Sequence, residues 1–308
     1  MTQPGPGAPG FRCAASSALR DEPLAGTAST IRAFLLIEDT GPWGSDALRD
    51  ARLPDGLGKR IRTRADAAGV RALLIRRPDR SGVEGHRVFA AYADPVRPQL
   101  ESGTITDLHD VLDLDLGALR AGRSSGLARD ESPLFCVCTH GKHDTCCAER
   151  GRPAAAALEA AHREHTWEVS HIGGDRFAGN MLVLPHGLYY GRIDAVTGLT
   201  VAGAHLAGEV ELDHLRGRSG LPTAVQYAEV ALRRDLAETR GDSVRFVSRE
   251  VRGDLTEARF DVAGSRYAVR VRTRYDPPER LTCSALRDNP IPVHDLVDVR
   301  RADLPVVE

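Results

Sequence analysis

The sequence contains no run of about 18 apolar residues, the length that a membrane-spanning helix requires. Residues 1–10 hold neither a basic segment nor an apolar one, so they do not resemble a secretory signal. The formal net charge is −2, which gives no basic excess of the kind that attracts nucleic acid or an anionic membrane. We therefore expect a cytoplasmic protein with no nucleic-acid partner and no membrane partner.

Aromatic residues are scarce as well, at 5% of the chain, so the core must be built mainly from Leu, Val and Ala. Lysine is rarer still: of the 41 Lys and Arg residues, only residues 59 and 142 are lysines, and the others are arginines. The hydrophobic share of 42% and the charged share of 27% are those of a soluble globular protein. These shares indicate a folded chain with an aliphatic core.

A chain of 308 residues is longer than one compact core usually supports, so two or three domains are expected. Residues 1–10 are rich in Pro and Gly and are interpreted as a disordered tail. Residues 11–121 are expected to form an N-terminal α/β domain, and a polar break separates them from a second unit at residues 131–220. Residues 221–308 are expected to form a helix and an antiparallel sheet, which makes the chain α+β overall.

Hydrophobic periodicity predicts where the helices and strands lie. Residues 106–116 combine an apolar stripe with Asp110, Asp113 and Asp115, and we interpret these acids as the solvated face of a helix that opens near Asp107, not as a metal site. Buried strands are expected at 33–38, 70–77, 87–94, 133–137 and 166–171, helices at 57–68, 153–161, 196–206 and 222–239, a hairpin at 180–193, and antiparallel strands at 244–251, 257–264, 266–275 and 280–286.

Four of the six cysteines lie within residues 134–192. Thiols stay reduced in the cytoplasm, so clustered cysteines there are more often metal ligands or redox groups than disulfides. Cys138 and Cys147 are separated by eight residues, whereas a zinc knuckle normally places two to four residues between its cysteines. A loop of this length can wrap around an inorganic cluster.

A Gly-Gly turn follows in the sequence, with His171 on one side and Asp175 on the other. Glycines at such a turn let the backbone approach a bulky inorganic group and offer amide hydrogens to its sulfur atoms. Two thiolates and two further donors match the number of ligands that a [2Fe–2S] cluster needs. The residues therefore predict a metal-binding, iron–sulfur site.

These motifs together resemble the sucraseferredoxin-like family. The resemblance rests on C-x8-C, on His-x-Gly-Gly followed by Arg-Phe-Ala, and on the P-x-G-x-Y-Y-G-R hairpin at residues 185–192. DEPLAGTA at residues 21–28 and GPWG at residues 41–44 are also similar to the N-terminal region of that family, so the resemblance spans roughly residues 11–210. It implies a thioredoxin-like ferredoxin domain at residues 131–220 whose [2Fe–2S] cluster is held by two Cys and two His.

Carried over residue by residue, the resemblance assigns cluster binding to Cys138, Cys147 and His171, while the second histidine of the family is Asp175 in this chain. We expect Asp175 to bind through its carboxylate. The alternatives are that His186 supplies the fourth ligand, or that the cluster is lost or labile. A carboxylate adds negative charge and favours the ferric state, which predicts a reduction potential below that of a bis-histidine centre.

The remaining cysteines are given structural interpretations. Cys136 and Cys146 are expected to pack beside the ligands, although a C-x-C and C-C set can also bind zinc. Cys13 stands alone and is interpreted as an inert packed residue. Cys283 is expected to be buried in the last predicted strand.

The resemblance implies one-electron transfer to and from a redox partner protein. The alternative is a cluster-free or zinc-binding thioredoxin-like domain that acts as a binding or thiol-redox module. Thiol exchange is the weaker of these, because the sequence has no C-x-x-C motif. Glycoside hydrolysis needs two opposed carboxylates, and the sequence singles out no such pair, so an electron carrier is favoured over an enzyme.

Overall fold

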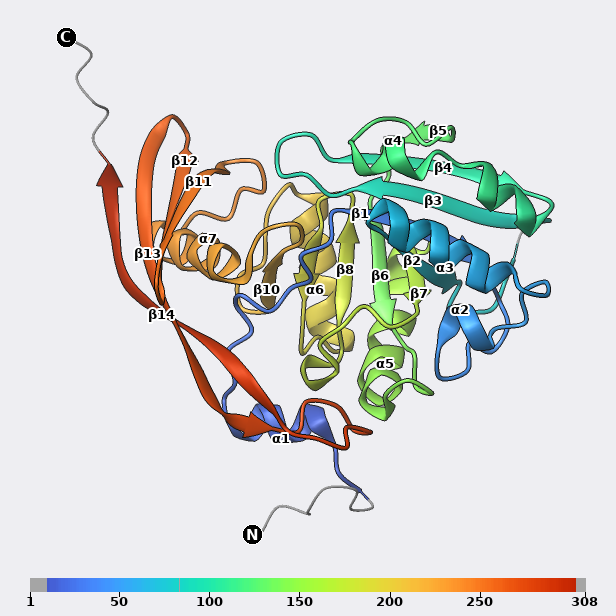
Figure 1. The fold of residues 1–308 in the computed structure, drawn as a ribbon, viewed down its shortest axis with the longest axis horizontal. Helices are drawn as coiled ribbons and strands as arrows, with labels where there is room; N and C mark the ends of the chain where they lie inside the picture. Colours follow the sequence, from blue (N-terminus) through green and yellow to red (C-terminus); the bar gives the residue numbers. More distant parts are fainter. Residues whose placement is uncertain (1–9, 83, 303–308) are drawn as a thin grey trace.

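The computed structural model describes residues 10–82 and 84–302, and within them ten strands form one mixed sheet (Figure 1). Neighbouring strands follow the order β10-β9-β8-β6-β7-β2-β1-β3-β4-β5. The tail expected at residues 1–10 lies outside the described residues except for Gly10. The strands are β1 Ala33–Glu38, β2 Val70–Arg76, β3 His86–Tyr92, β4 Gln99–Ile105, β5 Ala128–Asp130, β6 Leu134–Cys138, β7 Thr166–Val169, β8 Met181–Leu184, β9 Leu188–Tyr190 and β10 Leu215–Arg218.

Helices pack on this sheet, and none in the described part of the chain is long and apolar enough to cross a membrane. The buried side chains of α3 and α4 join one hydrophobic cluster with β1, β2 and β3, while those of α5 and α6 join another with β6, β8 and β9. The helices are α1 Cys13–Leu19, α2 Ala47–Asp50, α3 Leu57–Ala68, α4 Leu116–Arg120, α5 Thr145–His162, α6 Ala195–Leu206 and α7 Thr223–Leu236, with 3-10 helices η1 Leu108–Asp113 and η2 Asp175–Phe177.

Each half of the large sheet is built on two parallel strands joined by a helix. In the first half α3 connects β1 to β2, and in the second half α5 connects β6 to β7. The halves meet where β2 and β7 pair antiparallel, with Ile75 opposite Val169. A single cluster of buried side chains runs from β1 and β2 across β7, β6 and β8. The units expected at residues 11–121 and 131–220 therefore contribute to one sheet and share a core.

The expected mixed α/β class is confirmed, and several elements fall where the sequence places them. The apolar run of β1 is buried at all six positions, as expected for a strand covered on both faces. α3 ends at Gly69, whose φ of 67° is left-handed, a conformation that glycine adopts without the steric cost of a side chain. The hairpin of β8 and β9 is also confirmed.

The helix expected to open near Asp107 is interrupted in the structure. η1 covers Leu108–Asp113, and α4 begins only at Leu116. Asp107 caps η1 and Asp115 caps α4, because each carboxylate accepts a hydrogen bond from a backbone N–H group two or three residues later. Two capping side chains inside one predicted helix divide it into two short ones.

α5 begins eight residues earlier than the apolar pattern predicts. It starts at Thr145 rather than Pro153, and Asp144 caps it by accepting a backbone hydrogen bond of 2.9 Å in the first turn. The expectation that Cys138 and Cys147 share one long loop is therefore wrong for Cys147, which lies in the first turn of the helix. The buried side chains of this turn are cysteines. The turn therefore shows none of the Leu and Val spacing that indicates a helix in a sequence.

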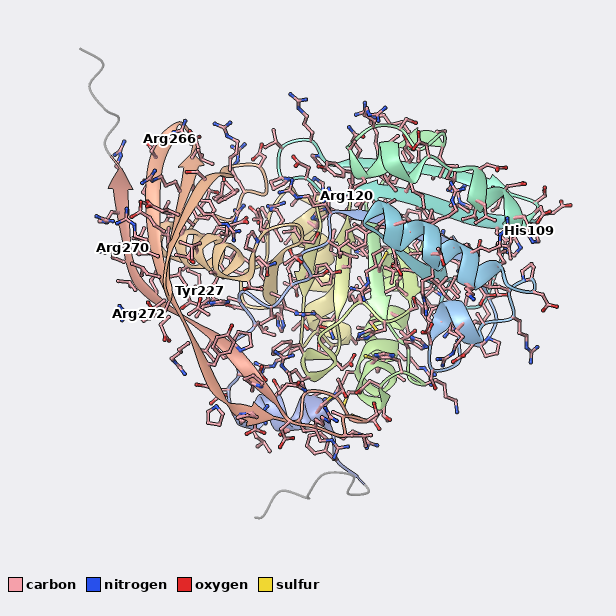
Figure 2. The ribbon with its side chains drawn as sticks, viewed as in Figure 1. His109, Arg120, Tyr227, Arg266, Arg270 and Arg272 are labelled. Atoms are coloured by element: carbon pink, nitrogen blue, oxygen red, sulfur yellow. The ribbon has the colours of Figure 1, made fainter. Side chains whose placement is uncertain are left out.

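The C-terminal module consists of α7 and a second, antiparallel sheet. Side chains of β12 alternate between buried and more exposed positions, which confirms the prediction of one wet face. Figure 2 shows Arg266, Arg270 and Arg272 of β13 projecting from the outer side of this sheet. Its strands, in the order β11-β12-β13-β14, are β11 Val244–Arg252, β12 Leu255–Val262, β13 Ser265–Glu279 and β14 Asn289–Ala302.

The last strand lies later in the chain than expected. Residues 280–286 form the connection between β13 and β14 instead of a strand, and Cys283 within it is half-buried rather than buried. A backbone hydrogen bond from Ala285 to Thr282 closes a turn there. Figure 1 shows the far end of the β13–β14 ribbon extending past the small sheet to α1. A loop at the end of this ribbon therefore lies against the start of the chain.

α5 approaches β6 so closely that only glycine fits at the contact. A Cβ atom on Gly151 would lie 2.1 Å from the carbonyl oxygen of Cys138. Backbone atoms on both sides leave no flexible group that could move aside. This contact fixes the distance between the end of β6 and the first turn of α5, and both of these carry cysteines.

We predict that Gly151→Ala lowers the free energy of unfolding by about 1–3 kcal/mol, because the added methyl group forces α5 away from β6. Urea denaturation measures the change. Gly203→Ala in α6 is the matched control, since a Cβ there meets nothing within 4 Å, and it should raise the free energy of unfolding by about 0.5–1 kcal/mol. Equal effects of the two substitutions would contradict the close contact.

Candidate metal centre

Two cysteines from adjacent elements face each other beside the large sheet. Cys138 is the last residue of β6, and Cys147 lies in the first turn of α5. Each residue is 1% exposed. The Gly151 contact brings these elements together, so the two thiols lie close to each other and away from water.

The segment after β7 delivers the two other predicted donors to the same place. The donor atoms of Cys138, Cys147 and His171 all lie within 4.8 Å of one another. Asp175 Oδ1 lies 3.3 Å from Cys147 Sγ and 2.9 Å from His171 Nδ1. The structure therefore brings together all four residues that the sequence singles out, although their role as ligands remains a prediction.

His171 Nδ1 is buried and has no hydrogen-bond partner, because its contact with Asp175 is close but not aligned for a hydrogen bond. A buried polar nitrogen without a partner is costly in a folded protein. Coordination of a cation at this point would satisfy the nitrogen. Thiolate, imidazole and carboxylate are together a donor set that suits zinc or iron.

The charges of this group depend on one another. The hydrogen bond with Cys147 lowers the pKa of Cys138 well below its ordinary value in spite of burial, and His171 adds to this effect. Burial opposes a charge on His171, but the adjacent Asp175 and Cys138 outweigh it and raise the pKa of His171 to about 9. Burial opposes a charge on Asp175 as well, but the adjacent His171 outweighs it and lowers the pKa of Asp175. Cys138 and Asp175 therefore favour their anionic forms, whereas the hydrogen bond with Cys138 raises the pKa of the Cys147 thiol.

A buried arginine of the edge strand β10, Arg216, holds the Gly-Gly turn before Asp175. Both Gly173 and Gly174 have left-handed φ values, 94° and 81°. Arg216 donates to the Gly173 carbonyl at 3.0 Å and to Asn180 Oδ1 at 2.8 Å. A Cβ on Gly174 would lie 2.3 Å from Arg216 Nη2. At Gly174 this guanidinium fills the space in which we expected an inorganic group.

Two histidines of the loop after β6 complete the outer wall of the centre, and the sequence interpretation passed over both. His140 Nε2 donates to the Gly44 carbonyl at 2.8 Å, which leaves Nδ1 to accept from the backbone N–H of His171 at 3.2 Å. His143 Nδ1 donates to the Ser45 carbonyl at 3.2 Å. The His143 ring stacks on His171 at 3.8 Å, and its Nε2 lies 3.8 Å from Asp175 Oδ2. His140 thus positions the backbone, and His143 is a further candidate donor.

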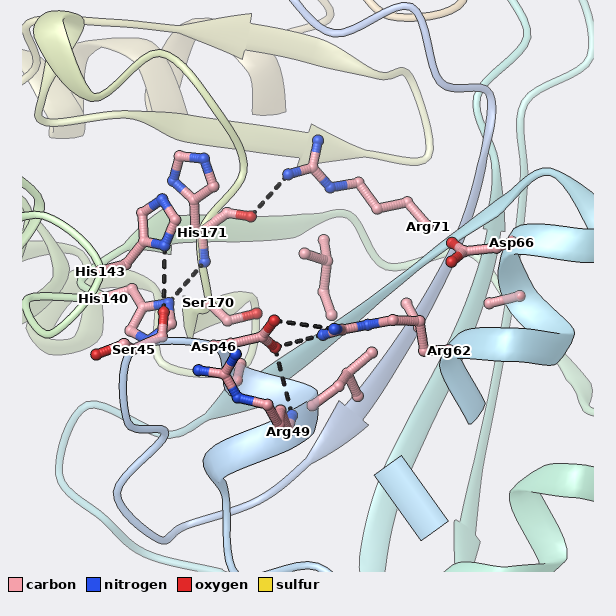
Figure 3. Close-up of a pocket in the computed structure, with 15 residues that line it drawn as sticks. Ser45, Asp46, Arg49, Arg62, Asp66, Arg71, His140, His143, Ser170 and His171 are labelled. Carbon is pink, nitrogen blue, oxygen red and sulfur yellow. Dashed lines mark hydrogen bonds and ion pairs between the residues drawn. The ribbon is translucent and has the colours of Figure 1, made fainter. Parts of the chain in front are cut away.

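This wall borders a cleft of about 330 Å³ between the two halves of the sheet (Figure 3). The side chain of His171 is 24% exposed and that of His143 is 36% exposed. Arg71 lies in the same cleft and donates to the His171 carbonyl at 2.8 Å. The imidazoles therefore face solvent while the two thiols are enclosed.

His186, the alternative fourth ligand, lies far from this group. β8 runs antiparallel to β6 with Leu134 opposite Leu184, so the turn that follows β8 is at the opposite end of β6 from Cys138. The His186 ring instead contacts His205 at 4.9 Å. If Asp175 is not the fourth donor, the geometry favours His143 over His186.

The other cysteines do not join this centre. Cys136 is buried in the core of the sheet, and that burial raises the pKa of its thiol. Cys146 faces a second group that contains Cys13 and Cys283, with a distance of 3.4 Å between the sulfurs of Cys146 and Cys283. Cys13 is buried and packed as expected, but it does not stand alone, because it lies beside Cys146 and Cys283. The sequence gives no spacing signal for this group, because its members come from remote segments.

Comparison with known proteins gives one match. A family model described as Sucrase/ferredoxin-like matches residues 24–217, well over half of the chain. No curated protein and no solved structure matches the chain. The matched residues include all four predicted ligands, while Cys13 and Cys283 lie outside them.

We predict that Arg216→Lys lowers the free energy of unfolding by about 2–4 kcal/mol, because an ammonium group cannot reproduce the forked contacts with Gly173 and Asn180. Denaturant unfolding measures the loss. Arg252→Lys is the control, since Arg252 is exposed and pairs with Glu250, and its effect should stay under about 0.5 kcal/mol. A change at Arg216 as small as the control would show that this guanidinium does not hold the turn.

Proposed function

The chain belongs to the Sucrase/ferredoxin-like family, and we propose that it is an electron-transfer protein whose Cys138, Cys147, His171 and Asp175 hold a [2Fe–2S] cluster. The observation that carries the proposal is the convergence of these donors from two separate segments at one buried point. The coarser statement, that this group has the composition of a metal site, holds independently of the cluster.

The donor set supports iron–sulfur chemistry in number and kind. Binuclear clusters take four protein ligands, and two of them can be imidazoles instead of thiolates. The description of the family names ferredoxins, which are iron–sulfur electron carriers. When bound, the cluster supplies one-electron transfer.

The residues around the donors have separate roles in this proposal. Burial of Cys138 and Cys147 keeps water from the thiolates, which protects them from exchange and oxidation. Arg216 places a positive charge near Asp175 and Cys138, and burial lowers the pKa of its guanidinium to about 10. His140 fixes the backbone at His171. In this proposal the enclosed thiolates bind the cluster on its buried side, and the imidazole of His171 lies on the side that faces solvent.

The asymmetry of exposure indicates where a redox partner protein would dock. Electrons cross short distances through a protein, so the partner must approach the face at which the centre is least covered. That face is the cleft beside His143 and His171. Its other charged residues include Arg49, Arg71 and Asp66, which suit a partner of mixed charge.

We predict that wild-type protein purified without oxygen contains about two iron atoms and about two acid-labile sulfides per chain. Cys147→Ser should lose nearly all of both, because it removes one buried thiolate ligand. Cys136→Ala is the matched control, since it removes a buried cysteine that lies outside the group, and it should retain the metal. Elemental analysis and a sulfide assay measure the contents.

The same assay tests the fourth ligand. Asp175→Ala should lose iron, whereas His143→Ala and His186→Ala should keep it. Loss of iron in His143→Ala but not in Asp175→Ala would assign the fourth position to His143. Protein without iron and sulfide that holds zinc, and loses this zinc in Cys147→Ser, would contradict the cluster and support the zinc-binding alternative.

We predict that Asp175→His raises the reduction potential, because a neutral imidazole replaces an anionic donor that stabilises the ferric state. Protein-film voltammetry compares the variant with wild type. Asp66→His is the control for charge alone, since Asp66 borders the cleft but does not belong to the donor group, and it should change the potential much less. A potential of Asp175→His at or below the wild-type value would rule out carboxylate ligation.

A further inference from the structure

Four possible metal ligands gather at a second place, from three remote parts of the chain. Cys13 is the first residue of α1, and Cys283 lies in the connection between β13 and β14. Asp144 and Cys146 come from the start of α5. Cys13, Asp144 and Cys146 are buried and Cys283 is half-buried. All four donor atoms lie within 4.8 Å of one another.

The distances between these donors are nearly equal. Cys283 Sγ lies 3.4 Å from Cys146 Sγ and 3.6 Å from Cys13 Sγ. The two carboxylate oxygens of Asp144 lie 3.6 and 3.7 Å from Cys13 Sγ. Around a tetrahedral Zn²⁺ ion with Zn–S of about 2.3 Å and Zn–O of about 2.0 Å, neighbouring sulfurs are about 3.8 Å apart and a sulfur and an oxygen are about 3.5 Å apart. The group therefore has the dimensions of a single tetrahedral site.

The same distances argue against a disulfide within this group. A disulfide has an S–S distance of about 2.05 Å, and pairing any two of three cysteines would leave the third thiol alone. Three thiolates and one carboxylate around one point suit a single Zn²⁺ ion.

The surroundings hold the donors in place. Asp144 Oδ1 accepts from the backbone N–H of Cys146 at 2.9 Å, and Oδ2 accepts from the backbone N–H of Cys283 at 2.6 Å. These contacts orient the carboxylate as hydrogen bonds orient ligands in known metal sites. Arg280 donates to the Cys283 carbonyl and adds a positive charge beside the loop.

We propose that Cys13, Asp144, Cys146 and Cys283 bind a structural Zn²⁺ ion that fastens α1 and the loop between β13 and β14 to the start of α5. Three thiols release their protons to solvent when the ion binds, and no electron is transferred. The ion joins segments 270 residues apart in sequence. It also stabilises the first turn of α5, which carries Cys147 of the first centre.

Zinc and iron contents of the full-length protein, purified without oxygen, test this proposal. Wild type should contain about one zinc per chain, with each metal removed by its own variants. Cys283→Ala should lose zinc and keep its iron, whereas Cys147→Ser should lose iron and keep its zinc. Cys136→Ala should keep both. A failure of the zinc site is thus distinguishable from a failure of the iron–sulfur proposal.

Wild-type protein loaded with Co²⁺ gives a second measurement that does not depend on the folding of a variant. We expect the intense thiolate-to-cobalt charge-transfer bands of a tetrahedral sulfur-rich site, and their loss when zinc is added. A zinc-free wild type that binds no Co²⁺ would overturn the proposal. So would a disulfide between Cys146 and Cys283, detected by thiol titration and peptide mapping, or retention of zinc in Cys283→Ala.

Discussion

The packing of α5 on β6 is the constraint on which both metal-ligand groups depend. At Gly151 the helix meets the carbonyl of Cys138 without a side chain between them, so the last residue of the strand and the first turn of the helix have a fixed separation. Successive residues of a helix project about 100° apart. Cys146 and Cys147 therefore point to different places: Cys146 faces Cys13 and Cys283, and Cys147 faces Cys138. One helical turn thus supplies a ligand to each group.

The sequence predicted those features that are local in character. β1 and α3 follow from hydrophobic period, and the hairpin of β8 and β9 follows from its turn residues. Cys138, Cys147, His171 and Asp175 were found because their motif lies within one stretch. Cys13 and Cys283 were misjudged because only tertiary structure brings them together. Hydrophobic periodicity predicted the wrong helix bounds in two places. In one, capping aspartates divide the predicted helix, and in the other, the buried residues of the first turn are cysteines.

The first half of the large sheet and its loops supply part of the centre even though they hold none of the proposed ligands. Carbonyls of Gly44 and Ser45 orient the rings of His140 and His143, and Arg71 holds the His171 backbone. These contacts join the two halves at the cleft, in addition to the pairing of β2 with β7. They also leave the imidazole side open to the cleft while the thiols stay enclosed, which gives the centre one accessible face.

The most direct test of the central claim is pulsed EPR on chemically reduced protein, with and without ¹⁵N labelling of histidine. The proposed ligand set predicts a paramagnetic iron–sulfur signal with strong coupling to a single imidazole nitrogen, that of His171. Strong coupling to two nitrogens would show that a second histidine occupies the position assigned to Asp175. A spectrum without coupling to nitrogen, or protein that gives no iron–sulfur signal, would contradict the account.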